Sequence, residues 1–106
     1  MTSLTEVTLD KAGERYSVIA VGHADTEAAC AAVSTLIFTL AGYLHNIPCR
    51  IMEEKLDSGD AKISWRGRQK DARCAFDMAA VGFMQLAQSY PTAARVVRRY
   101  RHKEVT

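Results

Sequence analysis

The feature that most constrains the fold is the stretch from Ala28 to Leu44, which contains no charged residue and is apolar on almost every side of a helix. Small or polar residues interrupt it at Ser34, Thr35, Thr39 and Gly42. It is shorter than the about 20 apolar residues that cross a bilayer as a helix, so we expect no membrane span. Because a helix that is apolar all round needs several packing partners, the sequence predicts a central helix against a sheet, with other elements on its flanks.

Alternating apolar and polar residues around this stretch predict strands. Residues 4–10 and 15–23 form a first pair, joined by a turn that contains Gly13. Residues 49–57 and 61–67 form a second pair, joined by a turn at residues Ser58, Gly59 and Asp60. Short connections of this kind favour antiparallel neighbours.

A second amphipathic helix is predicted over residues 70–89, ended by Tyr90 and Pro91. Its apolar face is formed by Ala72, Phe76, Ala79, Phe83 and Leu86. Residues 92–103 predict a last strand. The order β-β-α-β-β-α-β predicts an α+β sandwich, in which two helices cover one face of a mainly antiparallel sheet. With 106 residues, the chain has the size of one domain, 1–106.

Composition narrows the class of protein. With 48% hydrophobic and 25% charged residues, the chain is typical of a globular protein and not of a disordered or disulfide-rich one. A net charge of +2 is too small to indicate nucleic-acid binding by itself. Residues 1–16 contain acidic residues where a secretory signal has a basic flank and an apolar core, so we expect a cytoplasmic protein.

The three cysteines, Cys30, Cys49 and Cys74, are an odd number at wide spacings, which fits neither a disulfide framework nor a CxxC metal site. We expect reduced thiols, no metal and no cofactor, since phosphate loops, a Ser-His-Asp series and paired zinc ligands are also missing from the sequence. Cys49 and Cys74 are expected to pack in the interior, and Trp65 to cover one face of the sheet. His45 is expected to bind the last carbonyls of the first helix.

His23 and Cys30 form the pair with the clearest chemical potential. His23 ends the second predicted strand, on the face of Ile19 and Val21, and Cys30 lies about one turn into the following helix. The six residues between them can fold back and bring the two side chains together. A buried thiol near a loop histidine is the alternative, because small buried cysteines are common in alanine-rich helices.

A cysteine attacks as a thiolate, and an unperturbed thiol, with a pKa of about 8.5, is only a few per cent ionised at neutral pH. Lowering a thiol pKa by about two units takes about 2.7 kcal/mol. A helix N-terminus, here capped by Asp25 or Thr26, contributes about 0.3 to 1 kcal/mol, and about 2 in partly buried geometry. An imidazolium can add the rest, and the same imidazole can later pass a proton to a leaving amine.

Three motifs in order carry a family resemblance: "GHA" at residues 22–24, "CAAVS" at residues 30–34, and "AVGFMQLAQSYP" at residues 80–91. Together they resemble the ribosomal-processing cysteine protease family Prp. The resemblance implies a thiol protease, with Cys30 as nucleophile and His23 as general base and acid. It implies removal of a short N-terminal extension from large-subunit ribosomal protein L twenty-seven, or, in phage relatives, processing of capsid or scaffold proteins. It also implies a homodimer.

Two features depart from the family pattern. The segment between histidine and cysteine is shorter than in most members, and Glu27 stands where the family commonly has an aspartate. Glu27 can orient His23 or favour the helix N-terminus. Ser34, one helical turn after Cys30, can support the site by hydrogen bonding. Gly22, next to His23, is a further supporting residue. The short segment motivates an alternative function, a non-catalytic ribosome- or RNA-associated module that retains the protease fold.

The C-terminal segment is strongly basic. Its cations are Arg95, Arg98, Arg99, Arg101 and Lys103. Such a cluster can neutralise phosphates and contact ribosomal RNA. The alternative is a solvated edge strand whose charges discourage the addition of further strands.

Overall fold

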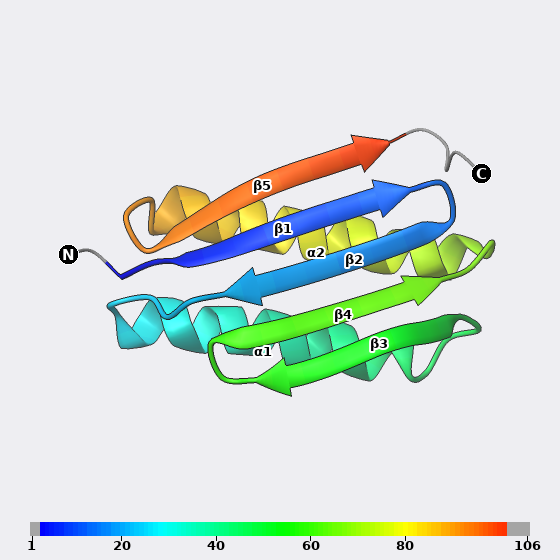
Figure 1. Cartoon of the computed structure of the whole chain (residues 1–106), viewed down its shortest axis with the longest axis horizontal. Coiled ribbons are helices and arrows are strands. Elements are labelled where there is room, and N and C mark those ends of the chain that lie inside the picture. Colours follow the sequence, from blue (N-terminus) through cyan, green and yellow to red (C-terminus); the bar gives the residue numbers. More distant parts are fainter. Residues whose placement is uncertain (1–2, 102–106) are drawn as a thin grey trace.

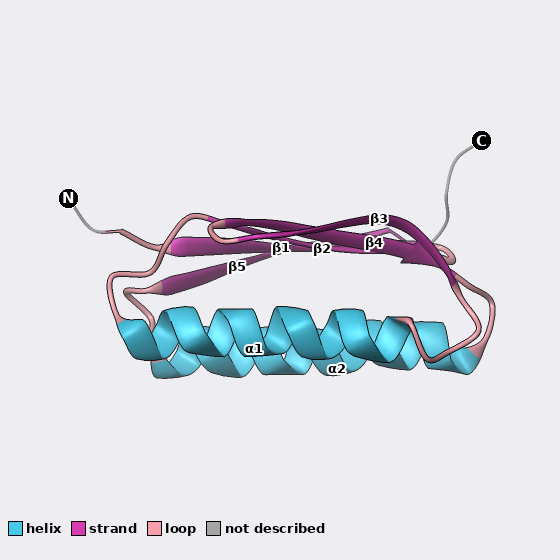
Figure 2. Cartoon of the chain, turned by 90° about the horizontal axis from the view of Figure 1, so that it is seen from below, coloured by secondary structure: helices cyan, strands magenta, loops and turns pink. Residues whose placement is uncertain are grey.

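The computed structural model describes residues 3–101, and its elements follow the predicted order. They are β1 (Thr5–Ala12), β2 (Arg15–Val21), α1 (Glu27–Leu44), β3 (Arg50–Asp57), β4 (Asp60–Arg66), α2 (Lys70–Ser89) and β5 (Ala94–Arg101). The five strands form one sheet in the order β3-β4-β2-β1-β5 (Figure 1). β1 and β5 pair in parallel, and all other neighbours are antiparallel. Both helices lie along one face of the sheet (Figure 2), so the predicted α+β sandwich is confirmed.

The core lies between the sheet and the two helices. Alternate residues of the central strands, such as Val7, Val18 and Ile63, are fully buried, since successive side chains of a strand point to opposite faces. The predicted apolar face of α2 is buried over its whole length; it consists of Ala72, Phe76, Ala79, Phe83 and Leu86. The opposite face of the sheet has no helix on it in the described part of the chain (Figure 2).

Three aromatic rings hold the sheet to α2. Tyr16 of β2 and Trp65 of β4 stack with ring centroids 5.6 Å apart, and both contact Phe76 of α2. Trp65 is only 1% exposed, and its indole N–H donates to the carbonyl of Ala72 at 3.0 Å. The predicted packing role of Trp65 is therefore confirmed. Burial raises the pKa of the Tyr16 phenol.

The long apolar helix, α1, is less enclosed than its composition predicts. Phe38 is 57% exposed and Tyr43 is 44% exposed. The expectation of elements on both flanks is wrong, because the described helix layer contains only α1 and α2 and leaves the outer side of α1 open. By length and composition alone, α1 would pass as a membrane-spanning helix, with a mean hydropathy of 1.5. Its residues Ile37, Leu40 and Leu44 instead pack into the core of the domain.

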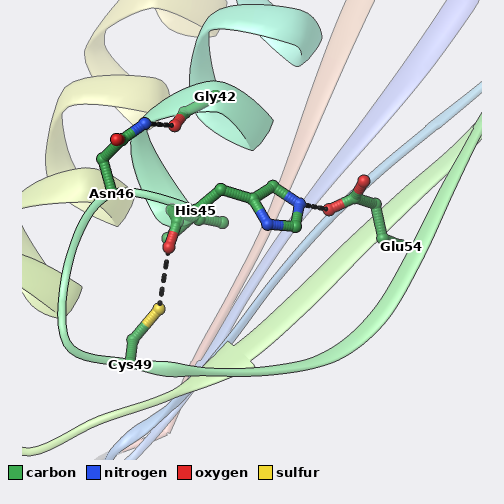
Figure 3. Close-up of polar contacts among 6 residues, drawn as sticks. Gly42, His45, Asn46, Cys49 and Glu54 are labelled. Carbon is green, nitrogen blue, oxygen red and sulfur yellow. Dashed lines mark hydrogen bonds and ion pairs between the residues drawn. The ribbon is translucent and has the colours of Figure 1, made fainter.

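The C-terminal end of α1 is held by side chains of the following turn (Figure 3). Asn46 donates from Nδ2 to the carbonyl of Gly42 at 2.7 Å. The ring of His45 leaves the helix, and its Nε2 lies 2.6 Å from a carboxylate oxygen of Glu54 on β3. The prediction that the His45 ring binds the last helix carbonyls is therefore wrong, because a carboxylate is the stronger partner; the His45 backbone N–H donates to Ala41 instead.

β2 ends at Val21, earlier than predicted, and its buried face carries Val18 and Ala20. Ile19 and Val21 therefore point to the open face of the sheet. The expectation that His23 continues the strand on an apolar face is wrong. Both faces of this segment contain apolar residues, so alternation alone does not show which face meets the helices.

Candidate functional site

The site is built where β2 leads into α1. Thr26 caps the helix, and its side-chain oxygen accepts a hydrogen bond from the backbone N–H of Ala29 at 3.2 Å. Cys30, the fourth helical residue, donates its backbone N–H to the carbonyl of Thr26 at 3.1 Å. The backbone N–H groups of Glu27 and Ala28 have no carbonyl acceptor within the helix, because no helical residue lies four positions before them. They form a pair of donors in the same first turn of the helix as Cys30.

The Cys30 thiol is half-buried and lies close to the backbone of the preceding loop. Its Sγ donates to the carbonyl of Ala24 at 3.2 Å. Buried Ala24, Ala29 and Ala93 form a small apolar cluster against which Cys30 and Tyr90 pack. The sulfur is therefore held beside Ala24, the residue that directly follows His23. The apolar cluster shields one side of the sulfur from water.

His23 is exposed, and the backbone before it is firmly held. Gly22 has a φ of +97°, and a Cβ there would lie 2.5 Å from the carbonyl oxygen of Leu4, so this position requires glycine. The N–H of Gly22 donates to the carbonyl of Gly59 at 2.9 Å, and its own carbonyl accepts from the Thr5 hydroxyl at 3.1 Å.

The His23 ring lies against Gly59 in the turn between β3 and β4. A Cβ added at Gly59 would be 2.7 Å from Cε1 and 2.9 Å from Cδ2 of the ring, and closer still to Nε2. In residues 3–101, the Cys30 thiol hydrogen-bonds to Ala24 and not to the His23 imidazole. Sequence reasoning did not connect Gly59 to the site, although the glycine of a "SGD" turn marks a place where another group can approach closely.

The remaining predicted site residues surround this position. Glu27 is exposed at the first position of α1, which suits an acidic side chain, and it forms no ion pair within the described residues. Ser34 is exposed and lines a small pocket of about 120 Å³ that also contains Gly22, Gly59 and Phe38. The pocket lies between α1 and the β3–β4 turn, and one of its lining residues, Gly59, is in contact with the His23 ring.

The other two thiols differ from each other. Cys49 is half-buried and donates to the carbonyl of Leu44 at 3.5 Å (Figure 3), in agreement with a packing role, and burial raises its pKa. Cys74 is exposed, so the prediction of interior packing is wrong for it. It lies on the side of α2 away from the face of Ala72 and Phe76. Residues 3–101 contain no cluster of side chains suited to hold a metal ion.

The family model of cysteine protease Prp matches residues 1–95. The chain belongs to the Prp family. This confirms the resemblance carried by the histidine and cysteine motifs and makes the chain a member of a cysteine protease family. No curated protein matches it in sequence.

Several solved structures have the same fold. Prp of Staphylococcus aureus, an essential ribosomal processing protease with a covalently linked product peptide, has a TM-score of 0.79 at 18% identity, covering 91% of this chain and 100% of that one. The same protease with a substrate peptide gives 0.72 at 17% identity, covering 91% and 100%. A Streptococcus mutans protein gives 0.72 at 21% identity, covering 92% and 99%.

Proposed function

We propose that this Prp-family protein is a cysteine endopeptidase that uses Cys30 and His23 to process a precursor protein in the cytoplasm. The observation that carries the proposal is the position of the Cys30 thiol, 3.2 Å from the carbonyl of the residue after His23 and one turn into a capped helix. The relative from Staphylococcus aureus is a ribosomal processing protease whose structure contains a substrate peptide, which supports a ribosomal protein precursor, here L twenty-seven, as the substrate class. A phage structural protein is the second substrate class.

The chemistry follows from the groups present. His23 takes the proton of the Cys30 thiol, and the thiolate attacks the peptide carbonyl. A C–S bond forms, and the resulting oxyanion accepts hydrogen bonds from the N–H groups of Glu27 and Ala28. His23 gives a proton to the departing amine as the C–N bond breaks, which leaves a thioester. His23 then takes a proton from water as that water attacks the thioester and releases the free acid. The exposed position of His23 gives its ring access to this water.

Glu27 and Ser34 are proposed as supporting residues. Glu27 keeps a negative charge at the helix N-terminus, and Ser34 places a hydroxyl on the wall of the small pocket beside His23. A homodimer stays a prediction, and the helix layer offers apolar surface for it in Phe38 and Met78, which are 57% and 78% exposed.

The direct test is incubation with candidate precursor proteins, followed by mass determination of the fragments. Cys30→Ala and His23→Gln should each abolish cleavage while the fold is retained by circular dichroism. Cys74→Ala and His45→Gln are matched controls, since both side chains are exposed and lie outside the site, and both variants should cleave normally. Turnover by Cys30→Ala would refute the assignment of Cys30 as nucleophile, and no cleavage by the parent protein would favour the non-catalytic module.

A further inference from the structure

The open face of the sheet carries a row of four arginines at the end farthest from Cys30. In register, Ala12 of β1 pairs with both Arg101 of β5 and Arg15 of β2. Arg15 pairs with Arg66 of β4, and Arg66 pairs with Arg50 of β3. The row therefore crosses all five strands, and strands spaced about 4.8 Å apart give it a length of roughly 19 Å.

All four arginines point away from the helices. Their neighbours along the strands, Tyr16, Trp65 and Tyr100, face the helix layer, where each contacts Phe76 of α2. Because side chains alternate along a strand, the adjacent arginines lie on the other face. Each of the four is exposed.

The row places like charges opposite one another in the sheet. Like charges directly opposite one another in a sheet are destabilising, so three adjacent arginines, Arg15, Arg66 and Arg50, oppose folding. Arg101 is paired with Asp10 at 2.8 Å, whereas Arg50 and Arg66 have no ion pair with a carboxylate of residues 3–101.

Beyond the row on the same face, the cations are matched by carboxylates. The pairs there are Lys55 with Asp60, Lys62 with Glu53 and Arg95 with Glu6. The positive charge on this face is thus gathered at one end. The basic C-terminal segment contributes Arg99 and Arg101 to it, while Arg98 lies in register with buried Leu9 and Lys103 lies outside the described residues.

A hollow of about 530 Å³ adjoins the row. It is lined among others by Asp10, Ala12, Arg15, Ser17, Lys62 and Arg101. The small side chain of Ala12, between two arginines, leaves room for it. The hydroxyl oxygen of Ser17 is buried and has no hydrogen-bond partner in the described part of the protein, so it can serve a ligand oxygen.

We propose that this surface, the arginine row of Arg15, Arg50, Arg66 and Arg101, binds single-stranded RNA through its phosphates. Guanidinium groups match phosphate oxygens bidentately. A protein partner would need an apolar centre depleted of charge, which a row of arginines does not offer, whereas nucleic-acid interfaces are polar and positive. The aromatic side chains beside the row face the helices, so no base stacks there and binding is independent of sequence. The surface is remote from Cys30, and the inference does not depend on proteolysis.

The test is fluorescence anisotropy of a short labelled oligouridine over a series of salt concentrations. Four phosphate contacts predict a slope of log K against log salt of roughly −3. The double variant Arg50→Gln with Arg66→Gln should weaken binding at low salt at least tenfold. It should also make the slope shallower by about 1.4, because each phosphate contact to a single strand contributes about 0.7.

Lys70→Gln with Arg73→Gln is the matched control, because it removes the same charge from exposed positions of α2, in the other layer. It should leave the affinity within about twofold, since screened charges that do not touch phosphate contribute little. Three results would overturn the proposal: no binding at low salt, equal losses in both double variants, or equally effective competition by polyglutamate, which would indicate an acidic protein partner.

Discussion

Replacing Gly59 by alanine is expected to have two effects: a loss of domain stability and a displacement of the His23 ring. Comparison with Gly13→Ala distinguishes the second effect from the first. Gly59 has a φ of +76°, where a residue with a Cβ is strained by roughly 1–2 kcal/mol. For a domain of this size, that strain lowers Tm by on the order of 5–10 °C. Gly13, in the β1–β2 turn at the other end of the sheet, has a φ of +62° and should show the same loss on substitution.

Of the two substitutions, only Gly59→Ala places a Cβ against the His23 imidazole. Its Cβ would be 2.7 Å from Cε1 of His23, whereas carbon atoms pack best at about 3.5–4.0 Å, so the ring must move by roughly 1 Å. A misplacement of about 1 Å at a reacting group can cost on the order of a hundredfold in rate. We therefore expect Gly59→Ala to lose about that factor in kcat/KM and Gly13→Ala to keep its activity.

The assay measures kcat and KM for a precursor peptide and Tm for both variants. Similar shifts in Tm with a loss of kcat confined to Gly59→Ala would support the role of the turn in positioning His23. Activity of Gly59→Ala within a few-fold of the parent, or an equal loss in Gly13→Ala, would refute it.

Two further predictions follow from burial. Burial raises the pKa of the Cys49 thiol, so iodoacetamide at neutral pH should label exposed Cys74 well before Cys49. The labelling rate of Cys49 should rise as the pH is increased. Equal labelling rates of the two cysteines, measured by peptide mass mapping, would contradict this. Burial raises the pKa of Tyr16 above its usual 10.0, so the stability that the neutral phenol contributes is present below that pH and is lost as pH rises through the folded-state pKa. Urea unfolding of Tyr16→Phe should show a smaller alkaline loss, with Tyr43→Phe as the exposed control, and identical alkaline losses in parent and Tyr16→Phe would exclude this cause.

The elements that local sequence specifies were predicted well. α2 begins and ends where its 3.6-residue pattern and the Tyr90-Pro91 stop place it, because periodicity and the steric effect of proline are local. The cap at Thr26 and the site of Cys30 one turn into α1 are equally local, since they depend on side chains within four residues of one another.

The errors arose where the outcome depends on distant segments. Both faces of β2 carry apolar residues. Packing against the helix layer buried Val18 and Ala20 and left Ile19 and Val21 on the other side. The composition of α1 does not show how many elements pack against the helix. The exposure of Phe38 is therefore known only from the tertiary structure. The ring of His45 turned to Glu54, which lies nine residues away on β3.

By itself, the sequence determined the strand and helix order, the capped helix start and the histidine and cysteine motifs, because these arise from contacts between residues close in the chain. Only the tertiary structure decided that Gly59 lies against His23 and that four arginines from four strands share one row. Strand order and register bring together residues 89 positions apart, as in the pair Ala12 and Arg101. Such pairings depend on which strands lie side by side, and no local pattern encodes that choice.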